Sequence, residues 1–266
     1  MIRILLLMLF VGVLATSVTA QQRIPANQNI YGIGSKGIIY DNELTFHLAL
    51  ATPRNIFIGM RSGKLITYDR MKFWSLSLGS IRASRERREN PDRINLLTNR
   101  VSRAYTYGKE NQLYALRVGF GTRKYLSEKA QQRGVAVGYS YEIGPSLGIL
   151  KPYYLEMTSG DGVPIDIRHT GENTAEFLSQ DRIFGASAWT VGIDEISLRP
   201  GIHAKAAAHF GFGAYDETAK ALEAGMMADF FLGETNLLIE SDLTPGVTNS
   251  PLFLSLYLKL HLGRRW

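Results

Sequence analysis

Four of the five histidines of this 266-residue chain lie in segments where polar and apolar residues alternate, and they share the polar side with charged residues. The set consists of His47, His203, His209 and His261 with Arg117, Glu142, Lys205, Glu223, Asp229 and Lys259. Imidazoles beside carboxylates and amines could relay protons or bind a metal ion. The alternative is a group of paired charges that fills a closed interior. No H-x-x-x-H or carboxylate spacing marks a metal site, so we expect paired charges, without metal or cofactor.

A second candidate is the basic segment 82–109, whose net charge is +5. Its candidate docking residues are Arg85, Arg87, Arg88, Arg93, Arg100 and Arg103. Such a segment could bind an acidic periplasmic or membrane protein partner, or anionic lipid headgroups. The alternative is a solvated loop. Nucleic acid is not expected as a partner, because no aromatic residues are interleaved with a basic motif.

Other motifs are weaker. Residues 32–37 (GIGSKG) match the G-x-G-x-x-G pattern, but no parallel-sheet strand precedes them and no helix follows, so we interpret the match as coincidence. Ser159, Asp161, Asp166 and His169 include the residue types of a hydrolase, yet a polar loop supplies such residues by composition alone. The chain has no cysteine, which excludes disulfides and thiolate catalysis.

Short alternating segments recur along the chain and predict strands that place the polar residues on one face. Leu44, Phe46, Leu48 and Leu50 alternate with Thr45, His47 and Ala49, and similar patterns occupy residues 56–61, 74–79, 114–120, 135–142, 202–213 and 222–230. The polar faces are rich in Gly, Ala and Ser, as expected for the crowded interior of a narrow barrel rather than for the outside of a soluble sandwich. Each segment has about the length that a tilted transmembrane strand needs.

The last segment, 252–266 (LFLSLYLKLHLGRRW), alternates leucine with polar or aromatic residues and ends in an aromatic residue. It resembles the closing strand of a Gram-negative outer-membrane β-barrel, and the resemblance is carried by Leu258, Leu260, Leu262 and Trp266. Arg264 interrupts the apolar series. The resemblance implies that these residues are the signal for the outer-membrane assembly machinery, and that outer-membrane lipid and lipopolysaccharide surround the protein.

The beginning of the chain is typical of a secretory signal peptide. One basic residue, Arg3, precedes an apolar run, and Val18-Thr19-Ala20 offers a small-residue cleavage site. The apolar run is shorter than a membrane-spanning helix requires. We therefore expect residues 1–20 to be removed during secretion across the inner membrane, and residues 21–266 to form one domain in the outer membrane.

The alternation predicts an all-β, closed antiparallel up-and-down transmembrane barrel of about ten strands, with a range of eight to twelve. This count includes a first strand at 31–40 and a turn at Gly144-Pro145-Ser146. In this register the short turns at Pro53, Pro145 and Asp216 face the periplasm. Loops 62–70, 124–133, 157–200 and 233–250 face outward. The long connection 82–109 then falls on the periplasmic side, which violates the usual asymmetry of such barrels.

A barrel of this size has an interior mostly filled by side chains. We therefore expect a non-enzymatic outer-membrane barrel with a structural, accessory or ligand- or partner-binding role. A narrow channel or porin-like conduit for ions or small solutes is the first alternative, and an outer-membrane lipid-modifying enzyme is the second.

Overall fold

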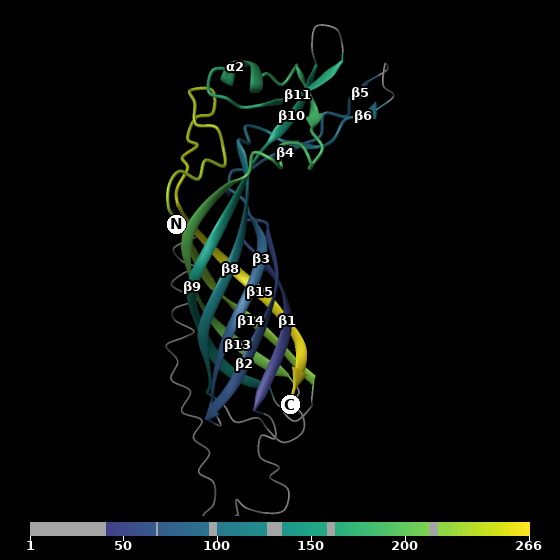
Figure 1. The fold of residues 1–266 in the computed structure, drawn as a ribbon. Helices are drawn as coiled ribbons and strands as arrows, with labels where there is room; N and C mark the ends of the chain where they lie inside the picture. The colour runs from purple at the N-terminus through teal and green to yellow at the C-terminus, as the bar shows by residue number, and fades with distance from the viewer. Residues whose placement is uncertain (1–40, 68, 96–99, 127–134, 159–162, 213–217) are drawn as a thin grey trace, which may run out of the picture. The chain divides into compact units, whose positions relative to one another are not determined.

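The computed structural model describes residues 41–67, 69–95, 100–126, 135–158, 163–212 and 218–266, which form a closed antiparallel barrel of eight strands with smaller sheets at one end (Figure 1). The barrel strands are β1 (Asn42–Ala51), β2 (Asn55–Thr67), β3 (Arg70–Ile81), β8 (Asn111–Tyr125), β9 (Ala136–Pro152), β13 (Ser197–Phe212), β14 (Thr218–Phe231) and β15 (Leu252–Arg265). Each strand pairs with the next one along the chain, and β1 closes the barrel against β15. The expected all-β, up-and-down barrel is confirmed.

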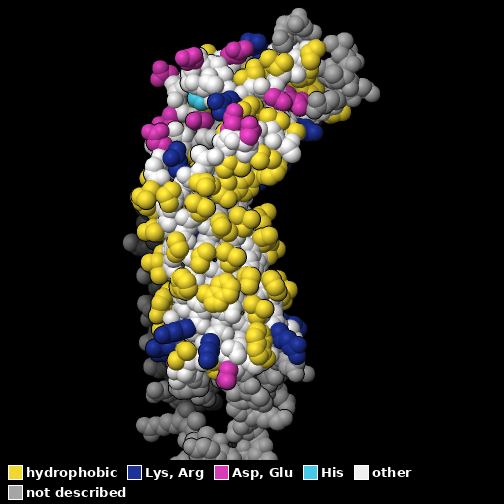
Figure 2. All heavy atoms as spheres, in the orientation of Figure 1, with side chains coloured by type: hydrophobic (Ala, Val, Ile, Leu, Met, Phe, Trp, Pro, Cys, Tyr) yellow, Lys and Arg dark blue, Asp and Glu magenta, His cyan; other side chains and the backbone are white. Residues whose placement is uncertain are grey.

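The alternating pattern sorts side chains between the two faces of the barrel wall. On β15, Leu254 and Leu256 are 72% and 61% exposed, whereas Tyr257 and Lys259 on the other face are 6% and 3% exposed. On the face seen in Figure 2, apolar side chains cover the outside of the barrel between its two ends. Since each of the eight barrel strands has a partner on both sides, the barrel sheet has no free edge strand, which is the condition for a sheet to lie in lipid.

The two ends of the barrel differ. The end where β1 begins and β15 finishes carries the short β2–β3 connection, and exposed cations lie around it (Figure 2). We call this the strand-terminus end. The opposite end carries the short β1–β2 turn and three long connections, 82–110, 153–196 and 232–251. We call it the loop end, and the described residues of the three long connections the loop assembly.

The loop assembly has its own sheets and core. Its elements are β4 (Arg88–Glu89), β5 (Ile94–Asn95), β6 (Arg100–Val101), β7 (Tyr105–Thr106), β10 (Tyr154–Thr158), β11 (Pro164–Arg168), α2 (Thr174–Phe177) and β12 (Ile183–Ala186). Strands β11, β10 and β12 form one sheet, and β4–β7 and β5–β6 form two small ones. The core consists of Tyr105, Leu155, Met157, Phe177, Leu178, Ile183 and Ile239, all buried. All three connections contribute to this core, which explains how long loops form one ordered unit.

The barrel has eight strands, fewer than the expected ten but within the expected range of eight to twelve. The expected turn at Gly144-Pro145-Ser146 does not exist, because β9 runs straight through it and Pro145 lies opposite Ile202 of β13. Proline lacks a backbone N–H, and the β8–β9 ladder skips the positions between Arg117↔Ser146 and Phe120↔Ile143. Strand β9 nevertheless continues, since its pairing with β13 on the other side is unbroken. The expected strand at 31–40 lies outside the described residues, as do the expected signal peptide at 1–20 and the glycine motif at 32–37.

The closure of the barrel between β1 and β15 also corrects the side on which several connections lie. Because β1 is the first strand of the closed barrel, the direction of every strand from β1 to β8 is the reverse of the expected one. The turn at Pro53 and segment 82–109 therefore belong to the loop end, and the connections at 62–70 and 124–133 belong to the strand-terminus end. The anomalous long periplasmic connection disappears, because 82–110 lies with the other long connections. Among the described residues, no helix is long and apolar enough to cross a membrane.

Candidate functional site

The barrel interior holds the polar residues that the alternation predicted to share one side of the sheet. All of the candidates are at most 8% exposed: His47, Arg117, Glu142, His203, Lys205, His209, Glu223, Asp229, Lys259 and His261. They come from six different strands. Closure of the sheet therefore brings together side chains that are far apart in the sequence.

Two carboxylates organise the middle of the interior, and Arg61 of β2 joins them. Arg61 donates from Nη1 to Oε2 of Glu223 at 2.8 Å and from Nη2 to Oε2 of Glu142 at 3.3 Å. Glu142 also accepts from Lys205 Nζ at 2.6 Å and lies 3.2 Å from His203 Nε2. A guanidinium group presents donors in a fixed fork, so it can bind two carboxylates at once.

Glu223 collects the remaining partners. Its Oε1 accepts from the hydroxyl of Tyr257 at 2.7 Å and from Lys259 Nζ at 3.2 Å. On the other oxygen, His261 Nε2 lies at 3.3 Å and His209 Nδ1 at 3.8 Å. The carboxylate is thus surrounded on both oxygens, as a buried charge requires. We call the residues around Glu142 and Glu223 the lumen network.

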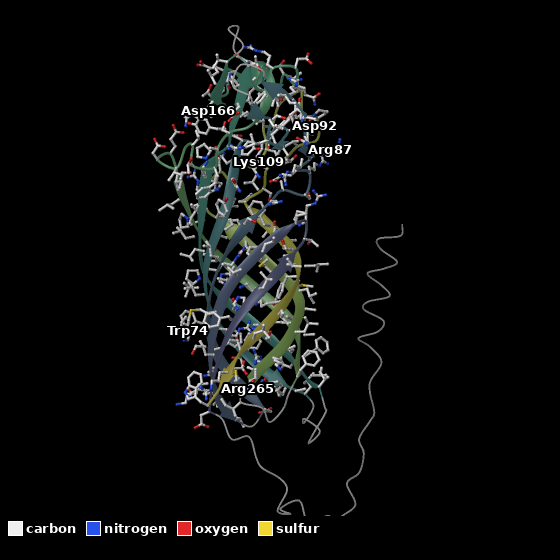
Figure 3. All side chains as sticks on the ribbon, turned by 90° about the vertical axis from the view of Figure 1, so that its right-hand side faces the viewer. Trp74, Arg87, Asp92, Lys109, Asp166 and Arg265 are labelled. Carbon is white, nitrogen blue, oxygen red and sulfur yellow. The ribbon has the colours of Figure 1, made fainter. Side chains whose placement is uncertain are left out.

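Two further ion-pair groups lie on either side of the lumen network. Arg117 makes a two-pronged contact with Asp229, from Nε to Oδ1 at 2.6 Å and from Nη2 to Oδ2 at 2.9 Å. Towards the strand-terminus end, Glu43 accepts from Arg123 and from Arg265, both at 2.9 Å (Figure 3). These two contacts link β1 to its neighbour β15 and, across the barrel, to β8.

An apolar cluster closes the interior towards the loop end. It contains Ala49, Ala51, Phe57, Ile81, Leu113, Ala115, Leu150, Met227, Phe231, Leu237 and Tyr257. Leu237 comes from the β14–β15 connection, and its backbone N–H donates to Asn249 Oδ1 at 3.0 Å. A void of about 10 Å³ remains beside His47 and Lys259, which is room for about one water molecule. The described side chains therefore fill the interior.

Three histidines of the interior, His47, His209 and His261, lie close to one another. The ring of His261 lies 5.3 Å from that of His47 and 6.1 Å from that of His209, measured between centroids. His47 and His261 face each other directly across the β1–β15 pair. In the part of the chain that the structure describes, no three His, Cys, Asp or Glu side chains are arranged to hold a metal ion.

The candidate docking arginines of segment 82–109 have different surroundings. Arg93 donates to the carbonyl oxygens of Gln180, Asp181 and Ile183, and Arg85 donates to that of Gly246. These two residues hold the loop assembly together. Arg85, Arg87, Arg88 and Arg103 are exposed and Arg93 is half-buried, while the side chain of Arg100 lies outside the described part.

Burial changes the pKa of several groups in the loop assembly. Burial and a hydrogen bond to Glu89 raise the pKa of Tyr105 to about 12. Burial lowers the pKa of Lys109, although Glu86, whose Oε2 lies 2.9 Å from Lys109 Nζ, acts in the opposite direction. Burial, with the nearby Glu234 and Glu240, raises the pKa of Glu110 to about 7.

The candidate residues of a hydrolase do not form a catalytic group in the described chain. His169 Nε2 lies 2.9 Å from Thr174 Oγ1, and Asp166 is exposed on β11. Ser159 and Asp161 lie outside the described residues. Sequence reasoning did not select Arg61, Glu43, Arg123, Tyr257 or Arg265, although each lies on the polar side of its strand by the same period of two.

Comparisons with known proteins return no family and only distant structural matches. No family model matches the chain, and no curated protein is significantly similar to it. A matching solved structure is that of Ail, the attachment invasion locus protein of Yersinia pestis, in complex with the heparin analogue sucrose octasulfate. The TM-score is 0.40 at 9% identity, and the match covers 85% of this chain and 99% of Ail. A match this distant says nothing about ligand or partner.

The closed antiparallel sheet, its apolar outside and its charged inside decide the architecture. The chain forms a closed, antiparallel, up-and-down β-barrel with an apolar outer face and a charged interior. In this barrel the leucines of the expected assembly signal, Leu258, Leu260 and Leu262, are 46–51% exposed on the outer face of β15, and Trp266 is 57% exposed. Their role in assembly remains a prediction.

Proposed function

We propose that the protein is a non-enzymatic outer-membrane barrel whose closed body carries the loop assembly as a binding surface for a ligand or partner outside the cell. One observation carries this proposal: the interior is filled from the Glu43 ion pairs to Leu237, while the three long connections fold together around a shared core. A conduit needs an open interior, and a binding surface needs ordered loops.

The membrane orientation follows from the lengths of the connections. Outer-membrane barrels have short periplasmic turns and longer extracellular loops. The loop end therefore faces outward, with lipid and lipopolysaccharide around the apolar wall. The proposal includes secretion with cleavage near Ala20 and insertion by the assembly machinery through the terminal strand. It places segment 82–109 outside the cell, away from periplasmic partners.

Two measurements test the proposal. Purified protein in a planar bilayer should show no stable conductance steps, with a large porin in the same bilayer as the positive control. The second measurement probes an array of glycans, lipids and outer-membrane proteins with the labelled protein and should reveal a ligand. Binding of this ligand should be lost in Phe177→Ala, which loosens the loop assembly. Reproducible conductance, or binding indifferent to Phe177→Ala, would contradict the proposal.

A further inference from the structure

A basic cleft of about 760 Å³ opens between the β1–β2 turn and the loop assembly. Its wall is formed by Pro53, Arg54, Arg82, Ala83, Ser84, Glu86, Arg88, Ala104, Thr106, Lys109, Gln112, Tyr153 and Trp189. The volume lies within the usual range of small-molecule sites. The cleft is separate from the filled barrel interior.

The charges of the basic cleft are unbalanced. Its one acidic residue, Glu86, is already bound by Lys109, and both side chains are less than 10% exposed. Arg54, Arg82 and Arg88 are exposed, and within the described chain no ion pair neutralises any of their guanidinium groups. Three like charges on one concave wall repel each other unless an anion lies between them.

The cleft also has an aromatic wall and neutral donors. Trp189 is 60% exposed, and its Nε1–H donates to the hydroxyl of Tyr114 at 2.8 Å, which fixes the ring. Ser84, Thr106 and Gln112 add hydroxyl and amide groups. An exposed indole offers a flat face against which the C–H face of a sugar ring can pack, and a guanidinium fork matches the oxygens of a sulfate, phosphate or carboxylate.

We infer that the basic cleft binds an anionic saccharide, with Arg54, Arg82 and Arg88 on its acidic groups and Trp189 against a sugar ring. This inference rests on the proposed binding function and specifies the class of ligand. Three separated cations and a cleft of this volume fit a sugar with several charges better than one inorganic ion. The saccharide can belong to the lipopolysaccharide of the same membrane or to a soluble glycan, since both present the same groups.

Tryptophan fluorescence of the refolded protein in detergent micelles provides the test. Dextran sulfate should change the emission and saturate, and the signal should disappear in Trp189→Phe. Arg54→Ala/Arg82→Ala/Arg88→Ala should weaken binding at least 30-fold. The control Lys64→Ala/Arg70→Ala/Lys72→Ala removes three exposed cations at the strand-terminus end and should change binding less than threefold. Neutral dextran should not bind.

Micelles containing lipopolysaccharide, intact or with its phosphates removed, distinguish the two sources. Cleft-dependent binding of the intact lipid alone assigns the saccharide to the membrane, and cleft-dependent binding of dextran sulfate assigns it to solution. Equal loss in both triple variants, or no binding of either probe, overturns the inference. If the array instead reveals a neutral or protein ligand, the proposed binding function stands and only the inference of an anionic saccharide fails. If the protein conducts ions in a bilayer, the proposed function fails, but the binding titrations of the cleft keep their meaning.

Discussion

Arg61 and Glu223 face each other across the barrel interior, with Nη1 of the guanidinium 2.8 Å from Oε2 of the carboxylate and each side chain 1% exposed. The same guanidinium reaches Glu142 at 3.3 Å. Strands β2, β9 and β14 are therefore linked through one side chain. Such a link supports the closed barrel from inside, in addition to the hydrogen bonds of the wall.

Replacement of Arg61 should destabilise the barrel strongly. Arg61→Ala leaves Glu142 and Glu223 buried with one cation fewer, and breaking a buried ion pair from one side costs roughly 3–5 kcal/mol. Urea unfolding in micelles, followed by the gel shift between folded and boiled protein, measures the loss. Arg70→Ala, at an exposed position of β3, should cost less than about 0.5 kcal/mol. A similar midpoint for both variants would contradict a structural role of the lumen network.

A charge on the lipid-facing side should be costly only near the middle of the membrane. Leu258→Arg replaces a side chain that is 48% exposed in the central part of β15, where it lies opposite Ala224 of β14. The expected cost is roughly 2–4 kcal/mol at the bilayer midplane and about 0–1 kcal/mol near the interface. Leu198→Arg, near the loop end of β13, is the matched control. Refolding into lipid vesicles at increasing urea measures both, and equal costs would mean that lipid does not cover this face.

Alternation along each strand separates the inner from the outer face, although it did not lead us to select Arg61 or Glu43. His203 and His209 of β13, for example, are both buried as expected, because lipid outside and a crowded interior impose opposite demands on neighbouring residues. Pro145 misled the strand count. Proline and glycine mark turns in most sequences, but one missing donor in the middle of β9 is tolerated when the neighbouring strand remains paired.

The partners of these side chains could not be predicted. Arg61 contacts Glu142 and Glu223 because closure places β2 opposite β9 and β14, and the period of two says nothing about contacts across a barrel. The basic cleft combines Arg54 of a short turn with Arg82 and Arg88 of a distant segment. The excess charge of 82–109 was visible in the sequence, but its division between structural and exposed arginines depends on the fold of the loop assembly.

The absence of cysteine from the sequence makes the orientation directly measurable. Asp166 is exposed in the loop assembly (Figure 3), and Lys220 is exposed near the strand-terminus end. A membrane-impermeant maleimide should label Asp166→Cys in intact cells. Lys220→Cys should react only after the outer membrane is permeabilised. The reverse pattern would place the loop assembly in the periplasm and contradict the proposed function.

The core of the loop assembly should unfold independently of the barrel when it is weakened. Phe177 is 1% exposed, and Phe177→Ala should cost the loop assembly about 3–5 kcal/mol through lost packing. Limited proteolysis should then cut 153–196 quickly, while the heat-modifiable shift of the barrel persists. Ile165→Ala, at a 47% exposed position of β11, is the control and should leave the cleavage rate unchanged. Loss of the gel shift in Phe177→Ala would show that the two parts depend on each other.

Glu110 should make the stability of the loop end depend on pH. Its folded pKa of about 7 lies above the ordinary value of 4.5, so the folded state holds the proton more tightly than the unfolded state. Stability is therefore highest below about pH 4.5, falls as the pH rises towards 7, and is constant above that value. Glu110→Gln keeps the shape without the charge.

The backbone N–H of Tyr153 donates to the carbonyl oxygen of Glu110 and reports on this part of the loop end. Glu110→Gln should slow the hydrogen exchange of this amide at pH 8 and should have little effect at pH 4. The measurement is hydrogen exchange corrected for the intrinsic rate at each pH. The control is Glu172→Gln, which removes an exposed carboxylate of the loop assembly and should leave the exchange rate of Tyr153 unchanged at either pH. A benefit of Glu110→Gln that is the same at pH 4 and pH 8 would mean that the negative charge is not the cause.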